Sequence, residues 1–101
     1  MIVYAVELDL QAGVADEYLV WLRAHVREML TLPGFLGAEI FERLEPAPET
    51  GRVGYSVHYR LRDRSDFEAY LRQHASRMRE AGLRAYGERV HASRSLLQAL
   101  G

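Results

Sequence analysis

The side chains of this 101-residue chain that could do chemistry are histidines, carboxylates, tyrosines and arginines, because the sequence has no Cys and no Lys. Without a cysteine there is no thiol nucleophile and no thiolate metal site. Without a lysine amine there is no Schiff base, which excludes enzymes of the pyridoxal-phosphate type. The four histidines are too widely spaced for a typical metal site. We therefore predict a protein with no cofactor and no metal.

Two histidines, His25 and His74, are the first candidates for a catalytic role. Each follows an aromatic residue by one helical turn and precedes a methionine by one turn, in Trp21-Leu22-Arg23-Ala24-His25 with Met29 and in Tyr70-Leu71-Arg72-Gln73-His74 with Met78. In a cavity, a neutral imidazole could act as a base or orient a ligand. The alternative is a packed histidine that is hydrogen-bonded to a tyrosine or to a backbone carbonyl.

The periodicity of apolar residues predicts the elements that position these side chains. Alternation predicts strands at 2–10, 35–44, 53–61 and 89–97, and helical spacing predicts a helix at 14–30. A second helix is expected to begin at a capping box formed by Ser65 and Glu68 and to carry its apolar face from Phe67 to Met78, with Gly82 and Gly87 loosening the segment that follows. This order predicts one α+β domain over 1–101, with the ferredoxin-like βαββαβ fold: an antiparallel sheet with both helices on one face.

The helix-facing side of this predicted sheet collects an unusual number of aromatic side chains. These candidate ligand-binding residues are Tyr4, Tyr18, Trp21, Tyr55, Tyr59 and Tyr70. One interpretation is a packed core in which each hydroxyl finds a partner. The other is an aromatic pocket for a small planar ligand whose oxygens the tyrosines orient.

The opposite side of the sheet carries no predicted helix and holds the charged residues Glu7, Glu39, His58 and Arg60. Burial of this face in a homodimer would add to the small core of one chain, and we take these four residues as the predicted dimer interface. An ordinary solvated sheet face is the alternative.

The charge pattern bears on the other partners. The net charge is −1 with both signs interspersed, so we expect no nucleic acid. No uncharged apolar stretch is long enough to cross a membrane, and no leader segment is recognisable, so we expect a cytoplasmic protein.

An ordered set of motifs, spread over nearly the whole chain, resembles a known bacterial family. The motifs are Tyr4, Tyr18-x-x-Trp21-Leu22-x-x-His25, Met29-Leu30, Pro33-Gly34-Phe35, Tyr59-x-Leu61, Tyr70-Leu71-x-x-His74-Ala75 and Ser93-Arg94. They resemble domain of unknown function 4286, within the dimeric α/β-barrel superfamily. The resemblance implies a ferredoxin-like protomer whose sheet pairs with that of a second copy. It implies no activity, because that family has none assigned, and fold alone does not carry function.

The wider superfamily includes cofactor-independent monooxygenases, isomerase-like proteins and haem-degrading enzymes. The haem-degrading members place an axial histidine on the second helix, where His74 lies, but they also use an Asn, and this chain has none. The sequence thus leaves three hypotheses open. They are a binder of a small aromatic or planar molecule, a monooxygenase- or isomerase-like enzyme that uses His25 and His74, and an interaction module without catalysis.

Overall fold

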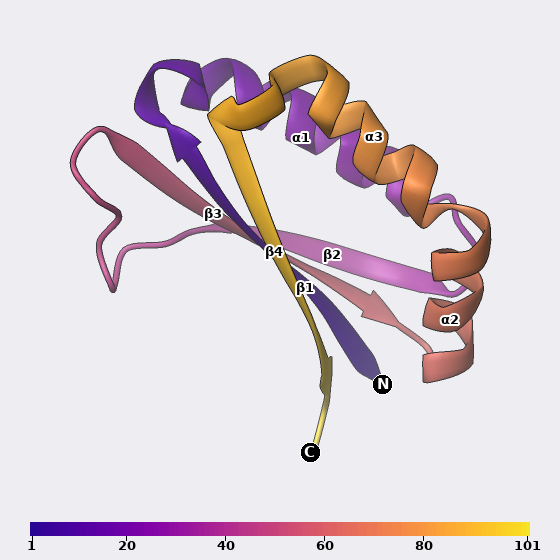
Figure 1. Ribbon diagram of the computed structural model, residues 1–101. Coiled ribbons are helices and arrows are strands. Elements are labelled where there is room, and N and C mark those ends of the chain that lie inside the picture. Colours follow the sequence, from indigo (N-terminus) through magenta and orange to yellow (C-terminus); the bar gives the residue numbers. More distant parts are fainter.

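A computed structural model describes residues 1–101 and contains one four-stranded antiparallel sheet with three α-helices (Figure 1). The strands are β1 (Ile2–Gln11), β2 (Phe35–Glu42), β3 (Arg52–Leu61) and β4 (Val90–Gln98). The helices are α1 (Ala15–Met29), α2 (Arg64–Gln73) and α3 (Ala75–Tyr86), and the short 3₁₀ turns η1 (Ala12–Val14) and η2 (Gly87–Arg89) precede α1 and β4. The strand order is β2-β3-β1-β4. The predicted ferredoxin-like α+β fold is confirmed.

The core lies between the inner face of the sheet and the helices, which gather on one side of it in Figure 1. Strand alternation puts Tyr4 of β1 between Tyr59 of β3 and Leu96 of β4, and all three side chains join the helix-facing core. From α1, Tyr18 and Leu22 complete this core, as expected from helical spacing. The same alternation sends Val3, Glu7 and their neighbours to the face without helices.

The second helix differs from the prediction, because it is divided at His74. This residue ends α2 and begins α3 with φ −133° and ψ −28°, outside the helical region. The two halves pack on different partners: Tyr70 of α2 contacts Phe35 and Tyr4, whereas Tyr86 of α3 contacts Tyr18 of α1. The change of direction at His74 lets one segment of chain reach both partners.

Helix α3 also continues through Gly82 to Tyr86, where the sequence predicted a loosened segment. A Cβ atom on Gly82 would lie 3.4 Å from Cη2 of Trp21, at the tight end of ordinary contact. Helix α3 therefore packs closely on Trp21 of α1 at Gly82.

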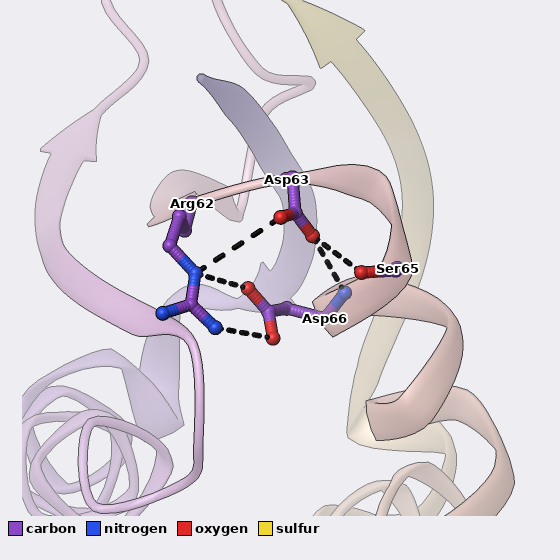
Figure 2. A network of polar contacts seen from close by, with 4 residues as sticks. All are labelled: Arg62, Asp63, Ser65 and Asp66. Atoms are coloured by element: carbon purple, nitrogen blue, oxygen red, sulfur yellow. Dashed lines mark hydrogen bonds and ion pairs between the residues drawn. The ribbon is translucent and has the colours of Figure 1, made fainter.

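The predicted capping box at Ser65 and Glu68 is wrong. Asp63 is the N-cap of α2, and its Oδ1 accepts hydrogen bonds from the backbone N–H of Asp66 at 3.1 Å and from Oγ of Ser65 at 2.7 Å (Figure 2). Arg62 donates two hydrogen bonds to the carboxylate of Asp66, from Nε at 3.0 Å and Nη2 at 3.1 Å. Aspartate is as good an N-cap residue as serine, and Asp63, which precedes Ser65, occupies the N-cap position of α2.

Strand β2 ends at Glu42, two residues before the predicted end at Leu44. None of the three helices combines the length and the apolar character that crossing a bilayer requires.

Candidate functional site

A cavity of about 440 Å³ lies between α1, α3 and the inner face of the sheet. Its lining is predominantly hydrophobic: 14 of the 21 residues that line it are of that kind. Helix α1 supplies Tyr18, Trp21, Leu22, His25 and Met29; α3 supplies Met78, Arg79, Gly82 and Leu83; and β4 supplies Val90, His91, Ala92 and Arg94. Strands β1 and β3 form the floor, with Tyr4 and Tyr59 among the residues there.

The α1 side of the cavity is a stack of flat rings. His25 lies one turn after Trp21, and the two rings stack with centroids 4.7 Å apart and an angle of 14° between their planes. Tyr18 lies on the other side of Trp21, at 5.5 Å, and Tyr86 meets both Tyr18 and Trp21 edge to face. Helical spacing within one α-helix therefore builds a continuous aromatic wall.

His25 is a neutral imidazole at pH 7. Burial lowers its pKa from the ordinary value of 6.5, and the nearby negative charge of Glu28 only partly opposes that effect. A neutral imidazole has one nitrogen that accepts a hydrogen bond or a proton. His25 is therefore the one weak base of the aromatic wall, and His91 of β4 supplies a second imidazole elsewhere in the lining.

The hydroxyls of three cavity tyrosines, Tyr18, Tyr59 and Tyr70, also stay uncharged. Burial and the neighbouring Tyr86 raise the pKa of Tyr18 to about 12. Burial raises the pKa of Tyr59 and of Tyr70 as well, with further contributions from neighbouring tyrosines. Each group can thus donate a hydrogen bond at neutral pH.

Two arginines that sequence reasoning missed belong to this site. Arg79 lines the cavity from α3, and its Nη2 donates a hydrogen bond to the hydroxyl of Tyr4 at 3.1 Å. Arg94 lies opposite Val6 in the β1–β4 register and lines the cavity from β4. A signal for Arg94 was present, since it shares the inward positions of β4 with the apolar residues Val90, Ala92 and Leu96.

The structure brings together most of the predicted ligand-binding aromatics and one of the two histidines. Tyr4, Tyr18, Trp21, Tyr59, Tyr70 and His25 all line the cavity. Tyr55 of β3 is buried but does not line the cavity, and the charged groups that act on it are Glu42, Asp16 and Arg23. His74 does not line it either, and Nη2 of Arg77 lies 3.1 Å from its Nδ1.

The four residues of the predicted dimer interface lie together on the outer face of the sheet. Glu39 and His58 are paired across β2 and β3, and Glu7 lies two positions from Ala5, the β1 partner of His58. Arg60 forms an ion pair with Glu39, and Ser56 donates a hydrogen bond to Glu7 at 2.8 Å. These polar contacts form within one chain, where the sequence had suggested contacts between two copies.

No group of three or more His, Asp and Glu side chains in the structure is arranged to hold a metal ion.

Comparisons with known proteins agree on the fold. A protein-family model described as "Domain of unknown function (DUF4286)" matches residues 1–100, and no curated protein matches the chain in sequence. The haem degrader MhuD of Mycobacterium tuberculosis, solved with two haems in its active site, is 19% identical, with a TM-score of 0.76 over 100% of this chain and 97% of that chain.

Two further solved structures are similar at the same level. SnoaB, a cofactor-independent oxygenase from Streptomyces nogalater, is 18% identical, with a TM-score of 0.70 over 99% of this chain and 94% of its own. A dimeric ferredoxin-like protein from an uncultured marine organism is 13% identical, with a TM-score of 0.73 over 99% and 95% of the two chains. At these identities the likeness shows the fold alone.

The residues of this chain do not fit a haem bound through the second helix. His74 is the imidazole that such binding would use, and it lies outside the cavity lining, beside Arg77. We therefore derive no haem chemistry for this protein.

Proposed function

The chain belongs to the family described as domain of unknown function DUF4286, as its sequence motifs predicted, and we propose a function from the cavity because that description names none. The protein binds a small aromatic or planar molecule between α1, α3 and the sheet. The observation that carries this proposal is the cavity of about 440 Å³ walled by the stacked rings of Trp21 and His25.

The dimensions and lining of the cavity support a ligand of this class. Pockets for small molecules typically enclose roughly 300–1,000 Å³ and combine apolar walls with a few polar groups. A flat ligand could extend the stack of Trp21, His25 and Tyr18 by the offset geometry that aromatic pairs prefer. The neutral hydroxyls of Tyr18 and Tyr59 supply polar groups that fix its orientation.

Binding of a neutral planar probe tests the proposal. Naphthalene-2-carboxamide, titrated by calorimetry, is expected to bind the wild-type protein with a stoichiometry of one per chain. Ala92→Phe puts a ring into the cavity from β4 and should weaken binding at least about tenfold, because it fills the space for the ligand. Ala24→Phe adds the same ring to the exposed side of α1 and should leave binding unchanged. Equal binding by both variants would contradict the proposal.

The proposal includes a homodimer formed through the outer face of the sheet. That face has no helix over it, and it exposes 47% of Phe41 and 48% of Leu97 beside Glu7, Glu39, His58 and Arg60. A second copy would bury these apolar side chains around the existing ion pair of Arg60 and Glu39. In sedimentation equilibrium, Phe41→Asp should yield monomers, whereas Leu44→Asp, in the loop after β2, should not. A wild-type monomer would refute the dimer.

The cytoplasmic location stays a prediction that cell fractionation checks.

A cofactor-independent oxygenase or isomerase is the second candidate function, and the neutral imidazole of His25 in the cavity favours it. A neutral imidazole can accept a proton from a bound phenol or from a carbon acid. Oxygen uptake with a planar phenol, naphthalen-2-ol, as substrate tests the oxygenase form. Activity should then be lost in His25→Gln and kept in His74→Gln; loss in both variants, or in neither, would argue against His25 as the base.

A further inference from the structure

We propose that the ligand of this cavity is an aromatic or planar anion, with a carboxylate held by Arg79 and Arg94. This inference rests on the proposed function, and it narrows the ligand from any planar molecule to one with a negative charge at the edge of its ring system.

Arg79 is the first observation. Its side chain lines the cavity from α3, and Nη2 is oriented by its hydrogen bond to the hydroxyl of Tyr4 at 3.1 Å. Its Nε–H is buried and finds no acceptor among the protein's own atoms. Buried donors almost always have a partner, and a charged one without a partner is costly. A ligand carboxylate in the cavity supplies an acceptor of the right charge.

Arg94 is the second observation, and it comes from the facing strand. It occupies an inward position of β4, where its neighbours on the same face are Ala92 and Leu96. Its positive charge acts on Tyr18, Tyr59 and Tyr70, lowering the pKa that burial raises in each of them. The guanidinium is therefore within electrostatic reach of the aromatic groups on α1, α2 and β3.

Neither arginine is neutralised by a carboxylate of the chain. Five other arginines form ion pairs with Asp or Glu side chains: Arg52, Arg60, Arg62, Arg64 and Arg84. Arg79 and Arg94 form none. Glu88, in the exposed turn η2, is the one carboxylate that lines the cavity, so two guanidinium groups face a single acid.

The surroundings make this charge effective for binding. Apart from Glu88 and His91, phenols and a neutral His25 form the rest of the polar lining, so a ligand carboxylate meets two guanidinium groups and one acid. Charge-assisted hydrogen bonds from a planar guanidinium fit a planar carboxylate well. For Arg79, whose Nε is buried, such bonds are also stronger than in water.

A pair of isosteric probes tests the inference. Naphthalene-2-carboxylate and naphthalene-2-carboxamide differ in charge and little else, and calorimetry on the full-length protein measures both affinities. We expect the carboxylate to bind at least about tenfold more tightly. Arg79→Gln and Arg94→Gln should each remove most of that preference, measured as the ratio of the carboxylate affinity to the carboxamide affinity of the same variant. Arg84→Gln on α3, whose side chain is 79% exposed, is the matched control and should keep the preference.

The outcomes separate this inference from the proposed function. If both probes bind equally well, the inference is wrong and the aromatic cavity still stands. If the preference survives in both Arg79→Gln and Arg94→Gln, the anion is held elsewhere and the inference is again wrong. If neither probe binds, both the proposed function and this inference are wrong. Arg94 is exposed on an edge strand, so its variant gives a folded protein even where Arg79→Gln does not.

Discussion

His25 and His74 stand in stretches of nearly the same sequence pattern but in different surroundings. His25 lies inside the continuous helix α1, stacks on Trp21 and faces the cavity. His74 lies at the junction of α2 and α3, outside the helical region of backbone conformation and outside the cavity lining. The aromatic residues one turn before the two histidines have similar surroundings, since Trp21 and Tyr70 both line the cavity.

The different surroundings of His25 and His74 show that side chains of a repeated pattern share a face only where the helix is continuous. In α1, residues one turn apart stay in line, so Trp21 and His25 present their rings to the same space. In the second stretch, the chain changes direction at His74, which joins α2 to α3, and α3 then packs against α1. One of the two candidate histidines is therefore a cavity residue, and the other is a residue of the helix junction.

The largest expected effect comes from the leucines at equivalent positions in the two stretches. Leu22 is 3% exposed and Leu71 is 42% exposed. Leu22→Ala removes a buried side chain and should lower the free energy of unfolding by about 2–5 kcal/mol. Leu71→Ala should lower it by less than about 1 kcal/mol. Urea denaturation of both variants measures the two values, and equal losses would mean that the two stretches pack alike.

A smaller effect is expected at the start of α2, where the cap differs from that of α1. Asp63 caps α2 through its side chain, whereas Val14 gives α1 no such bond. Asp63→Ala should lower the Tm by roughly 5 °C, and Ser65→Ala should lower it less. Calorimetric melting curves compare the two variants; a larger loss for Ser65→Ala would restore the capping box predicted from the sequence.

The cap also has a pH dependence of known sign. Hydrogen bonds from Ser65 and from the backbone of Asp66 lower the pKa of Asp63 below its ordinary value of 3.8. The stabilisation is therefore complete above that value and is lost as the pH falls through the lowered pKa of the folded protein. The Tm difference between wild type and Asp63→Ala should be constant near pH 7 and shrink in acid. A difference that persists in acid would contradict the cap's dependence on its charge.

The smallest expected effect is the pH dependence of stability that His25 contributes. Because burial lowers the pKa of His25, the unfolded chain binds a proton there before the folded protein does. The contribution of His25 to stability is thus complete above pH 6.5 and declines as the pH falls below it. Urea midpoints at pH 7.5 and 5.5 should differ less in His25→Gln than in wild type. A difference as large in His25→Gln as in wild type would show that His25 does not carry this pH dependence.

The sequence was sufficient for the fold and for part of the site. Alternation in β1 and β3 and helical spacing in α1 are local signals, so they predicted the strands and the inward positions of Tyr4, Tyr59 and Trp21. The division of the second helix at His74 depends on contacts with Phe35 and Tyr18, which are distant in sequence, and no local pattern marks it. Arg79 was missed because its hydrogen bond to Tyr4 joins residues that are 75 positions apart in the sequence.

The most direct test of a planar-ligand cavity beside His25 is an NMR titration with naphthalene-2-carboxamide. Trp21 is the only tryptophan of the chain, so its indole N–H gives a single resonance, and the histidine ring signals report on His25 and His74 separately. We predict that the signals of Trp21 and His25 shift together along one saturable curve while those of His74 stay in place. Saturable shifts at His74 with Trp21 unmoved, or no saturable shift at any of the three, would contradict the account.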